Sequence, residues 1–180
     1  MAVRMSRRTW VILAIVIVAV GATVGVTLSH SPASPSDSTL SIITWNDTTL
    51  STLEGTPAVL NFWSIGCSWC RYQLPFLEGV AQQSEGELEV IAVNTRESAS
   101  RIQTFFGDYE PAMTIAVDEN GEAFRDYCLA YNNTGGYIPF TLFVDSEGVV
   151  QYAKTGAFAS EAQLWDTLND VLGITVPQIS

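Results

Sequence analysis

The sequence predicts an α/β domain with a mixed central sheet, preceded by one transmembrane helix. Three observations lead to this fold class. Continuous apolar runs alternate with amphipathic stretches after residue 40, the last two predicted strands form a hairpin followed by a helix, and residues 10–28 contain no charged side chain. The chain has 180 residues, enough for one domain and an appendage, and 47% of them are hydrophobic, so an apolar core is available.

The apolar run at residues 10–28 is long enough to span a bilayer. As a helix it would reach roughly 28 Å at about 1.5 Å per residue, close to the hydrocarbon core of about 30 Å. Arg4, Arg7 and Arg8 precede it, so the positive-inside rule leaves residues 1–9 in the cytoplasm and exports the rest. A cleaved signal peptide is the alternative, but its apolar core is usually shorter and the residues after this run make a poor cleavage site. We therefore favour an uncleaved single-pass anchor in the cell membrane.

Residues 29–39 predict a flexible tether to a domain at residues 40–180, because they are rich in Ser and Pro and offer little apolar area to bury. The only histidine, His30, lies in this tether, which favours a solvated spacer residue over a metal ligand or general base. Acidic residues outnumber basic ones 19 to 8, for a net charge of −11. Such a surface repels phosphate backbones, so no nucleic-acid partner is predicted.

The first half of the domain predicts a hairpin, two buried strands and two helices. Residues 40–50 form the hairpin, because the turn residues Asn46 and Asp47 separate two short apolar runs. Residues 58–65 and 88–94 are continuous apolar runs, as expected of strands that are buried on both faces. The amphipathic stretches that follow these two strands predict helices at residues 67–83 and 97–106.

The second half of the domain predicts three more strands and two helices. Residues 113–117 form a strand and residues 122–130 a helix. After a polar, Gly-rich loop, residues 140–145 and 149–154 form strands joined by a turn. Ser160 is the predicted N-cap of a last helix, which has apolar residues at a period near 3.6. This order of elements implies a mixed sheet with helices on both faces.

The most informative motif is a C-x-x-C pair, Cys67 and Cys70, placed where a buried strand ends and a helix begins. Free N–H groups and the positive end of the dipole at a helix N-terminus stabilise a thiolate, so the pKa of Cys67 should lie below the value of about 8.5 for a free thiol. Two intervening residues bring the second sulfur within bonding distance of the first. The motif therefore predicts dithiol–disulfide exchange, with Cys67 as the nucleophile.

The other uses of these cysteines fit the sequence less well. Zinc normally takes four ligands, and only Cys128 and His30 remain as further candidates. A purely structural Cys67–Cys70 bridge would close a very short loop and add little stability. No metal and no cofactor are therefore predicted. Cys128 lies in a predicted helix among apolar side chains, which favours a buried free cysteine over a third redox thiol.

Several segments in order resemble the thioredoxin superfamily, specifically the membrane-anchored, extracytoplasmic thiol:disulfide oxidoreductases of the TlpA/ResA type. They are LSIITWNDTTLSTLEGTPAVLNFW, the C-x-x-C pair, Pro75 in the first helix, and YIPFTLFVDSEGVV. The resemblance covers residues 40–173. It implies a thioredoxin-like fold with an N-terminal hairpin and a central insertion. It also implies a cis Ile138–Pro139 peptide that faces the disulfide and, with Trp69, binds an extended substrate; an ordinary trans proline at a strand start is the alternative.

The sequence departs from the family pattern around the cysteines. Gly66 stands where the family usually has Trp, and Ser68-Trp69 stands where Glu-Pro or Pro-Pro is common. Because this dipeptide helps to set the redox potential, the potential and the direction of electron flow stay open. Thioredoxin itself has a buried Asp at the position of Asn61, where Asn is normal for the anchored branch, and some of that branch have a Glu at the position of Gln73. Neither position here offers a carboxylate to accept the proton of the resolving thiol. The loop at residues 131–137 is longer than usual, either as a specificity element or by neutral drift.

The sequence therefore predicts a membrane-tethered enzyme that exchanges disulfides with protein thiols outside the cytoplasm. The resemblance implies a membrane electron donor of the DsbD/CcdA type, and apocytochrome c or another secreted protein as substrate. A thiol peroxidase of the peroxiredoxin type is one alternative, although its Pro-x-x-x-Thr-x-x-Cys pattern is replaced by Leu60 and Ser64 before Cys67. A non-catalytic binding module or chaperone with the same fold is the other.

Overall fold

The structure is a computed structural model that describes residues 55–175. Within them lie five strands and four helices, and every boundary falls within two residues of its prediction. In chain order they are β1 (Ala58–Trp63), α2 (Ser68–Gln83), β2 (Glu89–Thr95), α3 (Ala99–Phe106), β3 (Thr114–Asp118), α4 (Glu122–Ala130), β4 (Phe140–Val144), β5 (Val150–Thr155) and α5 (Glu161–Leu172). The strands and helices predicted for this part of the chain are thus confirmed, as is Ser160 as the N-cap of α5.

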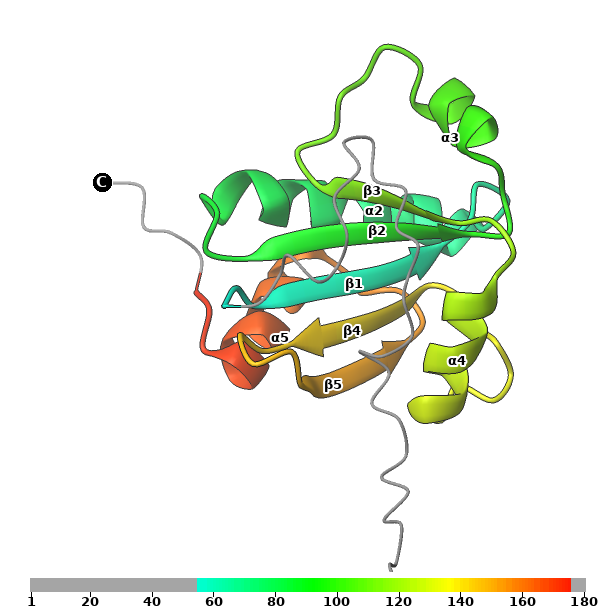
Figure 1. The fold of residues 1–180 in the computed structure, drawn as a ribbon. Coiled ribbons are helices and arrows are strands. Elements are labelled where there is room, and N and C mark those ends of the chain that lie inside the picture. Colours follow the sequence, from blue (N-terminus) through cyan, green and yellow to red (C-terminus); the bar gives the residue numbers. More distant parts are fainter. Residues whose placement is uncertain (1–54, 176–180) are drawn as a thin grey trace, which may run out of the picture. The chain divides into compact units, whose positions relative to one another are not determined.

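The strands form one mixed sheet in the order β3-β2-β1-β4-β5 (Figure 1). β1, β2 and β3 run parallel to one another, whereas β4 runs antiparallel to both β1 and β5. The parallel half is built by strand–helix–strand crossovers, and the antiparallel half by the short turn between β4 and β5. The predicted mixed central sheet is confirmed.

The central strand, β1, is buried along its whole length. Val59 and Trp63 belong to the apolar cluster that includes residues of α2 and α5, whereas Leu60 and Phe62 belong to the cluster that includes residues of α4. Successive side chains of a strand point to opposite faces, so a strand covered on both sides needs a continuous apolar run. The helices therefore cover both faces of the sheet, as predicted (Figure 1).

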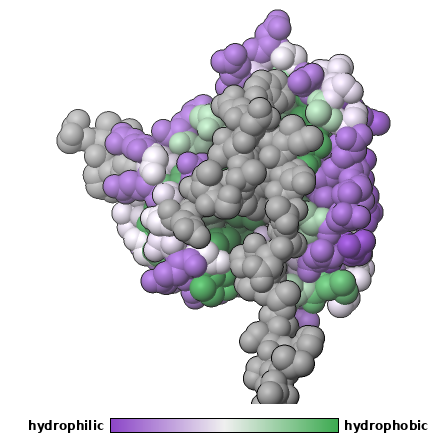
Figure 2. Space-filling view, in the orientation of Figure 1, coloured by the Kyte–Doolittle hydropathy of each residue, from purple (hydrophilic) through white to green (hydrophobic). Residues whose placement is uncertain are grey.

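The outer side of α4 is polar. Glu122 and Arg125 are exposed, and Arg125 pairs with Asp126 at 3.1 Å. Figure 2 shows mainly hydrophilic residues on the side of the molecule where α4 lies in Figure 1. The buried residues of α4, which are Ala123, Phe124, Tyr127 and Cys128, instead pack in the apolar cluster that includes Leu60 and Phe62 of β1.

Three separate segments of the chain meet at the carboxyl end of β1. Phe62 in β1 pairs with Phe140, the first residue of β4, and Phe140 pairs with Thr155, the last residue of β5. Because β4 is antiparallel to both neighbours, its start lies beside the ends of β1 and β5. The segments just after β1, before β4 and after β5 are therefore neighbours, and the first two carry Cys67 and Pro139.

Several predicted regions fall outside the described residues: the anchor at residues 10–28, the tether at residues 29–39 and the hairpin at residues 40–50. Between residues 55 and 175, no helix is both long enough and apolar enough to cross a membrane. The anchor, tether and hairpin remain predictions from the sequence.

Candidate active site

Cys67 and Cys70 form a disulfide at the start of α2. Cys67 is the N-cap of this helix, and its Sγ accepts a hydrogen bond from the Cys70 N–H at 3.1 Å. Cys67 is partly exposed, whereas Cys70 is fully buried. A second molecule can therefore reach this disulfide at Cys67 and not at Cys70.

The start of α2 also favours a negative charge on Cys67. Unpaired N–H groups and the positive end of the helix dipole stabilise an anion at this position, and the first turn of α2 carries no acidic side chain that would oppose it. When the disulfide opens, a thiolate on Cys67 would retain the Cys70 N–H as a donor. Since the thiolate is the nucleophilic form of cysteine, this geometry suits attack by Cys67.

The Ile138–Pro139 peptide faces the disulfide. Its peptide bond is cis, as the resemblance implied. The Cys67 Sγ lies 3.8 Å from the Ile138 carbonyl oxygen. Pro139 is buried, and its carbonyl accepts a hydrogen bond of 2.8 Å from the Gly156 N–H. The structure thus brings together Cys67, Cys70, Ile138 and Pro139, which are far apart in the sequence.

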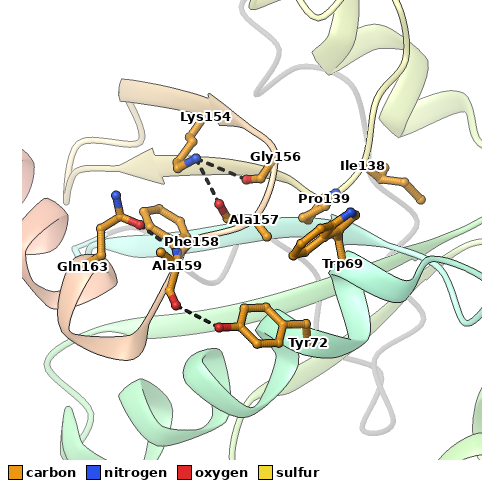
Figure 3. A pocket seen from close by; sticks show the side chains of 10 residues that line it. All are labelled: Trp69, Tyr72, Ile138, Pro139, Lys154, Gly156, Ala157, Phe158, Ala159 and Gln163. Carbon is orange, nitrogen blue, oxygen red and sulfur yellow. Dashed lines mark hydrogen bonds between the residues drawn. The ribbon is translucent and has the colours of Figure 1, made fainter.

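A groove with a volume of about 580 Å³ lies beside this peptide, between α2 and the segment that joins β5 to α5 (Figure 3). Trp69, between the two cysteines, is 67% exposed and meets Tyr72 edge to face, with 6.0 Å between the ring centroids. The Tyr72 hydroxyl donates a 2.9 Å hydrogen bond to the Ala159 carbonyl across the groove. The lining residues are Trp69, Tyr72, Ile138, Pro139, Lys154, Gly156, Ala157, Phe158, Ala159 and Gln163. Sequence reasoning found only three of these, Trp69, Ile138 and Pro139.

A neutral hydrogen-bond network lies beneath the site. Thr141 Oγ1 accepts from Asn61 Nδ2 at 2.9 Å and from Gln73 Nε2 at 3.3 Å, and Gln73 Oε1 accepts from the Phe158 N–H at 2.9 Å. Asn61, Gln73 and Thr141 are all fully buried. Gln73 lies three residues after Cys70 on α2. The two positions that lack a carboxylate therefore belong to a hydrogen-bonded network of amides and a hydroxyl.

Glu97 holds the loop that precedes Cys67. It was predicted to lie within a helix, but α3 begins two residues later, and the Glu97 carboxylate is free to bind elsewhere. Its Oε2 accepts from the Ile65 N–H at 2.7 Å and from Asn94 Nδ2 at 2.9 Å, and its Oε1 pairs with Arg101 Nε at 3.2 Å. The sequence pattern carried no signal for this role, because Ile65 and Glu97 meet only when β1 and β2 are paired.

Cys128, the third cysteine, is free and buried. Burial raises the pKa of its thiol, and the hydrogen bond from the Asn133 amide and the charge of Arg96 offset this only in part. A thiol with a raised pKa is mostly protonated near neutral pH and is therefore a poor nucleophile. The buried free cysteine predicted from the sequence is confirmed.

Together these features suit one kind of chemistry. The site offers a disulfide that is accessible at one sulfur, a helix end that stabilises the thiolate, and a groove beside them. Within residues 55–175, no three His, Cys, Asp or Glu side chains gather in the way that a metal site requires. The accessible sulfur, the helix end and the groove are arranged for reactions carried by the cysteine pair.

Comparison with known proteins identifies the family. The family model described as the AhpC/TSA family matches residues 35–153, which is more than half of the chain. The chain belongs to the AhpC/TSA family. The matched residues include β1 to β4, both cysteines of the disulfide and the Ile138–Pro139 peptide. The AhpC/TSA match thus covers the parts of the fold that form the candidate site.

Individual relatives agree with this assignment. The thiol-disulfide oxidoreductase ResA of Oceanobacillus iheyensis is 28% identical over 123 residues, which are 68% of this chain and 60% of the relative. The exposed lipoprotein thioredoxin Etrx1 of Streptococcus pneumoniae is 21% identical, covers 72% of this chain and 96% of that chain, and superposes with a TM-score of 0.59. A secreted disulfide oxidoreductase of Mycobacterium tuberculosis, described as homologous to E. coli DsbE, is 25% identical, covers 63% of this chain and 81% of that chain, and has a TM-score of 0.52.

The similarity to Etrx1 shows the thioredoxin-like fold, and the match to the ResA relative confirms the resemblance to proteins of the ResA type. The chain spans less than two thirds of the length of that ResA protein. The fold and the family are therefore established, and the activity is taken up below as a proposal.

Proposed function

We propose that this protein is a membrane-anchored, extracytoplasmic thiol:disulfide oxidoreductase that reduces disulfides in other proteins. The observation that carries the proposal is the asymmetry of the Cys67–Cys70 disulfide. Cys67 is accessible at the N-terminus of α2, whereas Cys70 is fully buried behind it. This is the division between an attacking and a resolving cysteine that disulfide exchange requires. The ResA relative, named a thiol-disulfide oxidoreductase, supports the same activity.

The reaction begins with the reduced protein. The Cys67 thiolate attacks one sulfur of a substrate disulfide, the substrate S–S bond breaks, and the departing substrate thiolate takes up a proton. Cys70 then attacks the Cys67 sulfur of the mixed disulfide, which releases the second substrate thiol and forms the Cys67–Cys70 disulfide seen in the structure. Two electrons pass from the protein to the substrate. A dithiol donor must therefore reduce the protein before the next cycle.

The location and the partners of this reaction rest on the sequence. Residues 10–28 and the preceding arginines support an anchor with the catalytic domain outside the cytoplasm, and the similar M. tuberculosis protein is described as secreted. Because an extracytoplasmic compartment is oxidising, a membrane electron donor of the DsbD/CcdA type would regenerate the reduced form. Apocytochrome c is one protein whose disulfide such an enzyme would reduce.

Trapping variants test the mechanism and identify the partners together. Cys70→Ser should accumulate mixed disulfides with natural partners, because Cys67 attacks and no second thiol displaces the adduct. Cys67→Ser is the matched control and should trap few or none, since its two remaining cysteines, Cys70 and Cys128, are both buried. Equal trapping by both variants would show that the two roles are wrongly assigned. No adduct with either variant, together with rapid peroxide consumption by the parent protein, would favour the peroxidase.

Cysteine labelling tests the location. A cysteine introduced at Ser36, in the predicted tether, should react with a membrane-impermeant thiol reagent in intact cells, while the protein stays in the membrane fraction. A shortened, soluble product would instead indicate a cleaved signal peptide. Binding that persists after both Cys67 and Cys70 are changed to Ala would favour the non-catalytic module.

A further inference from the structure

Lys154 is the only lysine in the 180-residue chain. It lies on β5 and lines the groove beside the disulfide, and it is the only charged residue among the ten that do so. The chain as a whole is strongly acidic, with a net charge of −11. A single cation is thus placed in the groove of a protein whose surface is otherwise dominated by carboxylates.

The contacts of Lys154 hold its ammonium group in place without neutralising it. Nζ lies 3.4 Å from the Gly156 carbonyl oxygen and 3.3 Å from that of Ala157, and 5.0 Å from the centroid of the Phe158 ring (Figure 3). An ammonium group has three donor protons, so two carbonyl acceptors leave one proton for a further partner. Within residues 55–175, no carboxylate lies within 4.0 Å of Nζ, whereas Arg101 is paired with a glutamate.

The groove around this charge is largely apolar. Trp69, Tyr72 and Phe158 supply aromatic surface, and the hydrogen bond from the Tyr72 hydroxyl to the Ala159 carbonyl fixes one wall to the other. Gln163 adds a neutral amide at the far end (Figure 3). The apolar walls reduce the contact of Lys154 with water, so a charge pair formed in this open groove is modestly stronger than one on the flat surface. The groove therefore suits an extended peptide that brings a carboxylate to Lys154.

From this geometry we infer that the groove selects substrates by charge: it binds the polypeptide segment next to the reactive cysteine and prefers segments with a Glu or Asp side chain, which pairs with Lys154. The inference rests on the proposed function, because it names the class of substrate for the same disulfide. Lys154 is a specificity residue in it and takes no part in the transfer of electrons.

Peptide substrates test this preference directly. Short peptides with one central cysteine and Glu, Gln or Lys beside it, on either side, are used as symmetric disulfide dimers. The reduced 180-residue protein converts each dimer to two peptide thiols and itself becomes the Cys67–Cys70 disulfide, so no other reductant is needed. Single-turnover rates are followed by acid quenching, alkylation and mass spectrometry. The Glu peptide should react about two- to fivefold faster than the Gln peptide, and the Lys peptide more slowly than either.

Variants assign the preference to Lys154. Lys154→Met keeps most of the apolar stem and should bring the Glu-to-Gln ratio to roughly one, whereas Lys154→Arg should preserve the preference because it keeps the charge. Arg71→Gln is the matched control: Arg71 is an exposed cation on α2 that does not line the groove, and its loss should leave the ratio unchanged. High salt should reduce the ratio in the parent protein, since the groove is open to solvent.

The outcomes separate the inference from the proposed function. Equal rates for all peptides with the parent protein would overturn the charge preference and leave the oxidoreductase activity standing. A uniform loss of rate in Lys154→Met with an unchanged ratio would overturn it too, because Lys154 would then only support the Gly156–Ala157 backbone. No reduction of any peptide by the parent protein would overturn both. The salt dependence and the Lys154→Arg variant keep the test decisive if Lys154→Met fails to fold.

Discussion

The side-chain amide of Asn133 holds both backbone groups of Tyr137. Asn133 Nδ2 donates to the Tyr137 carbonyl oxygen at 2.8 Å, and Asn133 Oδ1 accepts from the Tyr137 N–H at 3.1 Å. The Asn133 side chain is buried, whereas Tyr137 is 66% exposed. Because Tyr137 directly precedes the Ile138–Pro139 peptide, these two hydrogen bonds fix how the loop at residues 131–137 enters the active site.

Removing the two hydrogen bonds between Asn133 and Tyr137 should destabilise the protein and disturb the active site. Asn133→Ala deletes two hydrogen bonds to backbone groups, so we expect a loss of about 1–3 kcal/mol in the free energy of unfolding, measured by chemical denaturation of the 180-residue protein in detergent. Disulfide exchange should also slow, because Ile138 is no longer held against Cys67. Thr134→Ala, an exposed change in the same loop, is the control and should alter neither quantity. Full stability in Asn133→Ala would show that other contacts hold the loop.

The hydroxyl group of Thr141 should contribute more to the stability of the fold than the volume of its side chain does. Thr141→Val keeps the volume of the side chain but leaves the buried amide donors of Asn61 and Gln73 without their acceptor. An unpaired buried donor costs about 1–3 kcal/mol, so the variant should be less stable by roughly 2–4 kcal/mol in thermal or chemical unfolding. Thr141→Ser retains the hydroxyl and should recover most of this loss. A Val variant as stable as the Ser variant would mean that the network contributes little.

The fold could be predicted largely from local patterns. β1 is a continuous apolar run because it is covered on both faces, and Ser160 is one of the residue types that are preferred at a helix N-cap. The cysteine pair could be predicted because both its residues lie within one helical turn. These patterns are local in the sequence, so they can be interpreted without knowing which strands pair.

The rest of the site depends on strand register, which a single sequence does not carry. Lys154 and Phe158 reach the groove only because β5 pairs with β4 so that Thr155 lies opposite Phe140. Glu97 was predicted as a helix residue, but it accepts the Ile65 N–H across the paired ends of β1 and β2. The sequence carries one signal for this side chain: Lys154 is the only lysine in the chain.

The third cysteine should stay inert in the folded protein. Burial raises the pKa of Cys128, so its thiolate fraction near neutral pH is small, and the side chain is only 6% exposed. After reduction, we expect Cys67 to react promptly with a disulfide-type colorimetric thiol reagent and Cys70 to displace the adduct, so that two equivalents of chromophore are released, whereas Cys128 reacts only after denaturation. Cys128→Ala should release the same two equivalents promptly. Prompt modification of Cys128 in the native protein would contradict the packing role.

Glu78 links α2 to the segment that precedes β3. Its carboxylate accepts from the Tyr109 hydroxyl at 2.8 Å, from the Ala112 N–H at 2.9 Å and from the Met113 N–H at 3.3 Å, with Gln82 as a further donor. Burial alone would raise the pKa of Glu78, but these hydrogen bonds, led by the one from Ala112, outweigh it and hold the pKa below the ordinary value of 4.5. The charged form is thus favoured in the folded state.

This lowered pKa predicts how the contribution of Glu78 depends on pH. Because the folded-state pKa is below the ordinary value of 4.5, the stabilisation is fully present above that pH and is lost as the pH falls through the folded pKa. Glu78→Gln keeps the shape but loses the charge and one acceptor, so it should cost about 1 kcal/mol at neutral pH, a small value because the site is partly exposed. The difference in the free energy of unfolding between the parent protein and the variant should be constant from neutral pH to about pH 5 and shrink below about pH 4.

Unfolding free energies measured across this pH range check the prediction. The exposed Glu87→Gln is the control and should stay within about 0.5 kcal/mol of the parent protein throughout. A difference that stays constant or grows on acidification would contradict the role of the charged carboxylate as the acceptor.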